Sequence, residues 1–205
     1  MVTSVWEVRE AKKLCEAVKE ELTQEGVPFS ESVQVGIMIE TPAAALTADL
    51  LARESDFFSI GANDLTQYTM AADRGNAMVE KLCSVFQPAV LRSIRNVIAA
   101  AKEAGIPVGM CGEAAADPAL IPLFMAWGLD EFSVSPASVP ASRACISRWH
   151  GSEAAKLARE ALRRSTAAGV ESCLRAPFLS PNTGETAGGE EDDPVFITNG
   201  GVKPF

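Results

Sequence analysis

The spacing of apolar residues divides most of the chain into alternating helices and strands. Apolar side chains recur every three or four positions from Val5 to about Gly26, which predicts an amphipathic helix. A β-branched apolar run at 33–39 then predicts a short buried strand. Thr41 as N-cap and Pro42 at the first helical position are typical of a helix start, so this strand is expected to lead directly into a helix.

The same order of strand and helix repeats downstream. We expect further strands at 56–60, 107–110 and 130–134, and helices at 42–54, from about 64, 88–104, 117–127, 137–149 and 152–168. Strands that alternate with helices favour parallel pairing, so the predicted class is α/β.

The composition changes near the C-terminus. From about residue 176 onward Pro, Gly, Thr and acidic residues dominate and no apolar period is visible. This pattern predicts a folded domain at 1–170 and a flexible tail at 171–205.

Charge and cysteine content narrow the class of protein. With 47% apolar residues among 205 the chain is expected to be soluble and globular, and its net charge of -9 disfavours nucleic acid as a partner. No apolar run approaches the roughly 20 residues of a membrane span. The cysteines are odd in number and widely spaced, which indicates a reducing cytoplasm rather than disulfides or a zinc site. They are Cys15, Cys83, Cys111, Cys145 and Cys173.

Polar side chains follow each of four predicted strands. They are Glu40 after the first, Asn63 and Asp64 after the second, Cys111 with Gly112 and Glu113 after the third, and Ser133 and Ser135 at the fourth. Because the carboxyl ends of parallel strands meet at one edge of a sheet, we expect these groups to lie together.

Glu40 and Asp64 suit a hard divalent cation such as Mg²⁺, which takes one or two carboxylates and completes its octahedron with water and substrate oxygens. Two structural alternatives stay open. Glu40 is also an acid at a helix N-terminus, which the helix dipole favours. Asn63 and Asp64 are also typical turn residues.

A chemical and a structural role are compared for three residues, which are Arg74, Cys111 and His150. Arg74 lies in the polar break "AADRGN" and could clamp a phosphate, although most arginines are solvated surface groups. Cys111 ends a strand between Gly109 and Gly112, where its thiol could donate or accept a proton, whereas a free cysteine is usually a small buried apolar residue. His150 lies outside the strand ends, so a capping or solvated role is expected.

Four segments together resemble the C-terminal phosphoenolpyruvate-binding domain of the Enzyme I family of the bacterial sugar phosphotransferase system. They read "VGIMIETPAAA", "DFFSIGANDLTQYTMAADRGN", "PVGMCGEAAADPALIPL" and "GLDEFSVSPASVP", and the resemblance runs from residue 1 to about 165. It implies a TIM barrel of which this chain carries the last four strand-helix units.

The resemblance also implies specific roles. Glu40 and Asp64 correspond to magnesium ligands, Asn63, Asp64 and Arg74 to phosphoenolpyruvate contacts, and Cys111 to the proton donor that turns the enolate into pyruvate. The family passes the phosphoryl group to a histidine on an N-terminal domain and from there to a phosphocarrier protein. That domain is expected to be absent here, and a homodimer or a partner chain is expected to complete the barrel.

The chain departs from the family at several positions. Ala62 replaces a usual Thr, Ala116 replaces a usual Gly, and "KLCSVFQP" replaces "HLYQP". Three alternatives therefore remain: a non-catalytic dimerisation or regulatory remnant, a segment of the pyruvate phosphate dikinase and phosphoenolpyruvate synthase type, and a lyase of the related pyruvate-enolate barrels. Cys111 in "GMCGE" counts against the lyase.

Overall fold

The structure, a computed structural model that describes residues 1–179, is built on a four-stranded parallel sheet. The strands are β1 (Ile37–Ile39), β2 (Phe58–Gly61), β3 (Val108–Cys111) and β4 (Glu131–Ser133), and they lie side by side in sequence order. The α/β class with parallel pairing is confirmed. Within residues 1–179 the sheet does not close on itself, because β1 and β4 pair on one side only.

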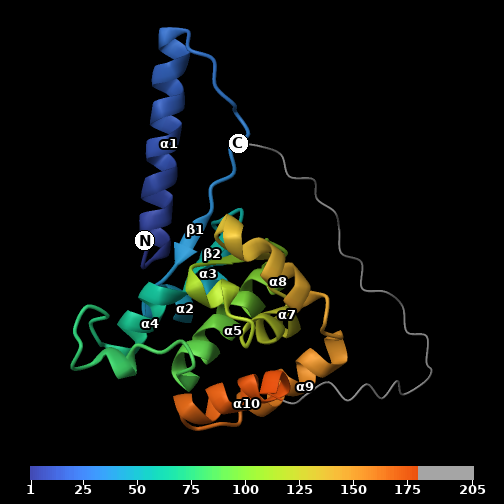
Figure 1. Ribbon diagram of the computed structural model, residues 1–205. Coiled ribbons are helices and arrows are strands. Elements are labelled where there is room, and N and C mark those ends of the chain that lie inside the picture. The colour runs from blue at the N-terminus through green and yellow to red at the C-terminus, as the bar shows by residue number, and fades with distance from the viewer. Residues whose placement is uncertain (180–205) are drawn as a thin grey trace.

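Helices follow every strand (Figure 1). They are α1 (Val5–Glu25), α2 (Pro42–Leu46), α3 (Ala48–Ala52), α4 (Ala62–Met70), the 3-10 helix η1 (Glu80–Leu82), α5 (Pro88–Ala104), α6 (Glu113–Ala116), α7 (Ile121–Trp127), the 3-10 helix η2 (Pro136–Ser138), α8 (Val139–Ile146), α9 (Gly151–Ala161) and α10 (Ala167–Leu179). No helix in this part of the chain is both long and apolar enough to cross a membrane.

One face of the sheet carries the core. Ile39, Ile60 and Met110 are fully buried on this face. Helix α5 adds a row of buried apolar side chains to the core, and α2, α3 and α4 pack against α5. On the other face, Met38, Ser59 and Gly109 lie in one row and are only partly buried. The sheet is therefore well covered on one side and open on the other.

Helix α1 stands away from the sheet in Figure 1. The amphipathic pattern that predicted it is present, yet Val8 is its only buried residue. Leu14 and Val18, one helical turn apart, are 69% and 51% exposed. The apolar face of α1 is thus largely unpartnered within residues 1–179.

Two expected elements differ in extent because side chains compete for backbone hydrogen bonds. The strand expected at 33–39 is reduced to 37–39, since the N–H of Val35 donates to the side chain of Asp56 at 2.6 Å. The helix expected at 42–54 begins as predicted, with the Thr41 hydroxyl accepting from Ala44 N–H. It breaks at Thr47, which ends α2 and starts α3.

The later helices also differ. The helix expected at 117–127 starts later, in α7, because Asp117 is extended and ends the separate short helix α6. The helices expected at 137–149 and 152–168 end earlier, in α8 and α9. Helix α10 occupies 167–179, so the tail expected from 171 cannot start there. Its Val170 and Leu174 are buried, and Pro177 inside the helix hid it from a sequence reading. Residues 180–205 of the predicted tail lie outside the described part.

Candidate functional site

Four residues form a row across the carboxyl end of the sheet. Cys111 pairs with Gly61 on one side and with Ser133 on the other. Because Ile39 pairs with Ile60, Glu40 lies opposite Gly61 and continues the row. Alternation along each strand places the row on the open face, the face that also presents Met38 and Ser59.

Gly61 lets the Glu40 carboxylate lie over the end of β2. A methyl group at position 61 would come within 2.8 Å of Glu40 Oε2 and 2.9 Å of Glu40 Cβ. The Cys111 Sγ atom approaches the same strand and lies 3.7 Å from the carbonyl oxygen of Ile60. Both functional groups therefore lean toward β2, from opposite sides.

Substituting Gly61 should test this close approach. We expect Gly61→Ala to destabilise the fold by about 1–3 kcal/mol, because the Cβ would overlap Glu40, which is packed and cannot retreat freely. Urea unfolding measures the change in the free energy of unfolding. Gly151→Ala is the matched control, since nothing lies within 4 Å of a Cβ there. An equal loss in both variants would contradict the account.

Glu40 is a buried carboxylate with a modest set of partners. It is 7% exposed, and its one recorded ion pair within residues 1–179 joins Oε1 to the amino nitrogen of Met1 at 3.5 Å. A buried carboxylate is costly unless a cation or hydrogen-bond donors compensate it. The environment of Glu40 therefore favours a bound cation.

Helix α4 starts directly after β2 and carries the next group of polar residues. Asp64 lies in its first turn, where the helix dipole favours a negative charge. Arg74 Nη2 lies 3.5 Å from Asp64 Oδ1, and the backbone N–H of Arg74 donates to Oε1 of Gln67 at 3.0 Å. Gln67 thus fixes the backbone of the polar segment 71–76 through this hydrogen bond. Nothing in the sequence marked Gln67 as part of a site.

The loop after β3 comes close to Asn63. Gly112 adopts a positive φ of 90°, and a Cβ there would lie 3.5 Å from Nδ2 of Asn63. The ends of β2 and β3 are therefore in contact through Asn63 and Gly112, as the clustering of strand ends predicts.

Asn63 and Arg74 also line a cavity of about 330 Å³. Glu113 joins them from the start of α6. The other lining residues are Thr66, Glu80, Cys83, Val85, Ala114, Asp117 and Leu120. Sequence reasoning assigned no role to these residues, three of which lie in the loop around 80–86, where the chain departs from the family segment "HLYQP".

Some candidate residues lie elsewhere. Ser135 pairs its hydroxyl with that of Ser138 at 2.9 Å, and His150 is the residue before α9. Burial raises the pKa of the Cys145 thiol, so that group stays protonated. Cys83 donates to the carbonyl of Ala72 at 3.0 Å but also lines the cavity, so it is not simply a core residue.

The carboxylates of Glu40 and Asp64 come from the ends of neighbouring strands, and both are oxygen ligands that suit Mg²⁺. Within residues 1–179 no group of three or more His, Cys, Asp or Glu side chains could hold a metal. A magnesium site with two carboxylates needs no third, because water and substrate oxygens complete it. The donor types of Glu40 and Asp64 therefore suit this ion, and a site in which the two carboxylates share one ion stays a prediction.

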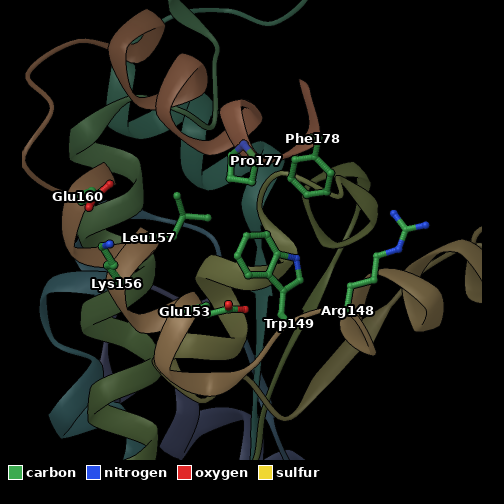
Figure 2. A pocket seen from close by; sticks show the side chains of 8 residues that line it. All are labelled: Arg148, Trp149, Glu153, Lys156, Leu157, Glu160, Pro177 and Phe178. Atoms are coloured by element: carbon green, nitrogen blue, oxygen red, sulfur yellow. The ribbon is translucent and has the colours of Figure 1, made fainter. Parts of the chain in front are cut away.

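A larger cavity of about 780 Å³ lies between α9 and α10 (Figure 2). Trp149 and Phe178 line it with their rings tilted by 57° and the ring centroids 6.1 Å apart. The lining residues are Arg148, Trp149, Glu153, Lys156, Leu157, Glu160, Pro177 and Phe178. None of the predicted site residues is among them, so size alone does not identify the functional site.

Comparison with known proteins adds an independent observation. Residues 1–150 match the family described as PEP-utilising enzyme, PEP-binding domain, where PEP is phosphoenolpyruvate. The chain belongs to this family. Among relatives, phosphoenolpyruvate-protein phosphotransferases from Lactococcus lactis subsp. cremoris and Haemophilus influenzae are 51% and 46% identical over 162 and 183 residues. The resemblance deduced from the motifs is confirmed.

The relatives of this PEP-utilising family member are much longer. The matched stretches cover 79% and 89% of this chain but 28% and 32% of those two proteins, so the chain spans about three tenths of their length. Wherever a match of 183 residues starts in a chain of 205, it must include α10. Helix α10 therefore belongs to the part shared with relatives, beyond the 150 residues that the family description matches.

Proposed function

We propose that this chain provides the PEP-binding part of a phosphoenolpyruvate-protein phosphotransferase of the Enzyme I type. The main support is the row at the strand ends, which brings Glu40 and Cys111 to one face beside Asn63 and Asp64 at the start of α4. Relatives with that printed name, at about half identity, point the same way.

Each residue has a distinct task in this proposal. Glu40 and Asp64 would hold Mg²⁺, which would neutralise charge on the phosphoryl group. Asn63 donates its amide N–H groups to substrate oxygens. Arg74 supplies a cation on an exposed side chain, and Gln67 fixes the backbone from which that side chain extends.

The reaction then has two steps. The phosphoryl group leaves PEP as its P–O bond to the enol oxygen breaks, and a new P–N bond forms to a histidine that the rest of the enzyme supplies. The pyruvate enolate that remains takes a proton at carbon 3 from the Cys111 thiol. The Cys111 thiolate then recovers a proton from water, which completes the cycle with pyruvate as product.

The proposal also includes a closed TIM barrel made with other strands. β1 and β4 each have an unpaired edge within the described residues, and the apolar side chains of Leu14 and Val18 on α1 are exposed. Unpaired edges and exposed apolar faces favour association with further protein. A partner chain, a second copy or the rest of a longer protein would cover them, and a phosphocarrier protein would receive the phosphoryl group.

Magnesium-dependent binding of PEP tests the proposal. We expect calorimetry to show PEP binding by the purified chain only with Mg²⁺, and Glu40→Gln or Asp64→Asn to weaken it by at least about tenfold. Glu103→Gln, on exposed α5 surface, should have no effect. Binding that is absent, or unchanged by chelation of the metal, would favour a non-catalytic dimerisation or regulatory remnant instead.

A further inference from the structure

We infer that Arg175 of α10 is a positioning residue for the cavity in which Asn63 and Arg74 meet. The inference rests on the proposed function for the ligand, although the contacts themselves do not. Arg175 lies outside the 150 residues that match the family description and within the helix that the sequence pattern had partly assigned to a tail.

Arg175 makes three contacts, two of them with distant parts of the chain. Its Nη2 donates to Asp117 Oδ2 at 3.2 Å, across 58 positions of sequence. Its Nε donates to Glu171 Oε1 at 2.9 Å, one turn earlier on the same helix. Its guanidinium carbon lies 5.3 Å from the ring centroid of Phe86, close enough for a cation–π contact.

One of these partners lines the cavity, and another is the neighbour of a lining residue. Asp117 lines the cavity directly, in the turn that also carries Glu113. Phe86 is only 6% exposed and does not line the cavity itself, but it follows Val85, which lines the cavity together with Cys83. Arg175 thus connects the loop that carries Phe86 with the turn that carries Asp117, and these two segments come from different strand-helix units.

The hydrogen bonds of Asp117 show how the guanidinium of Arg175 fixes the orientation of the Asp117 carboxylate. Asp117 Oδ1 accepts from the backbone N–H of Ala119 at 2.9 Å, while Oδ2 accepts from Arg175. With both oxygens held, the carboxylate cannot rotate and the turn at 112–118 is fixed. A single exposed ion pair contributes little to stability, so the main effect is expected on loop geometry rather than on global folding.

Hydrogen exchange and ligand binding on the 205-residue chain test the inference. In Arg175→Met we expect the amides at 82–88 and 112–118 to exchange faster and Mg²⁺-dependent PEP affinity to fall about three- to tenfold. Arg175→Lys keeps one ion pair and should restore only part of the protection. Val170→Ala is the matched control, because it removes buried methyl groups from α10 without touching Arg175.

A double-mutant cycle identifies the coupling. Asp117→Asn keeps an acceptor for Ala119 but loses the charge. The double variant with Arg175→Met should therefore lose almost no more exchange protection or PEP affinity than either single variant. Unchanged exchange in both loops, additive effects, or an equal loss of affinity in Val170→Ala would overturn the positioning role. If the wild-type chain binds no PEP, the proposed function fails, and the exchange measurement alone then decides the role of Arg175.

Discussion

Replacing Cys111 with alanine is expected to reduce pyruvate formation about 10²- to 10⁴-fold in an enzyme reconstituted with the phosphoryl-accepting part. The thiol lies at the end of β3, in the row with Glu40 and beside the backbone of Ile60, on the open face where the proposal places the reacting carbon. A proton donor acts on the reacting carbon and not on the phosphate. PEP binding should therefore stay within about twofold of wild type.

Two measurements separate this role from a packing role. Pyruvate release is followed by a coupled assay and PEP binding by calorimetry on the same samples. Cys15→Ala is the control, because that thiol is exposed on α1, away from the strand ends. Full pyruvate production by Cys111→Ala would remove Cys111 from the mechanism, and a parallel loss of PEP binding would indicate a packing defect.

The sequence predicted the α/β class and the alignment of strand ends for a physical reason. A short β-branched run such as 33–39, followed directly by helix-start residues, favours a buried strand, and parallel strands bring their carboxyl ends to one edge. The grouping of Asn63 with Gly112, and of Glu40 with Gly61 and Cys111, follows from that rule and from register.

Features that depend on long-range contacts were not predictable in the same way. The bond from Arg175 to Asp117 joins residues 58 positions apart, a separation that no local pattern marks. The break at Thr47 between α2 and α3 was likewise not indicated by the apolar spacing of that segment. Gly61 reads as a turn glycine, whereas its main constraint is the Glu40 side chain from the neighbouring strand. For Arg175 and Gly61 the local structure depends on a contact partner that the surrounding sequence does not identify.

Pyruvate release by the 205-residue chain alone, with Mg²⁺ and PEP, is expected to stay at the uncatalysed background. Phosphoryl transfer needs an acceptor in line with the breaking bond, and positioning supplies most of the rate. His150 is the single histidine of the sequence, and it precedes α9 instead of following a strand of the sheet. The relatives named phosphoenolpyruvate-protein phosphotransferase are about three times as long, so they contain ample chain for an acceptor and for further strands.

Supplying the remaining part should restore the reaction. We expect co-expression with the preceding region of a close relative to give a complex that releases pyruvate and phosphorylates a carrier protein, because added strands can pair with β1 and β4 and cover Leu14 and Val18 on α1. Size-exclusion chromatography with light scattering detects the complex, and labelled PEP detects the transfer. His150→Gln in this chain should leave the restored activity unchanged. Efficient carrier phosphorylation by a monomer of this chain alone would show that four strands suffice, and would contradict the proposed need for a completed barrel.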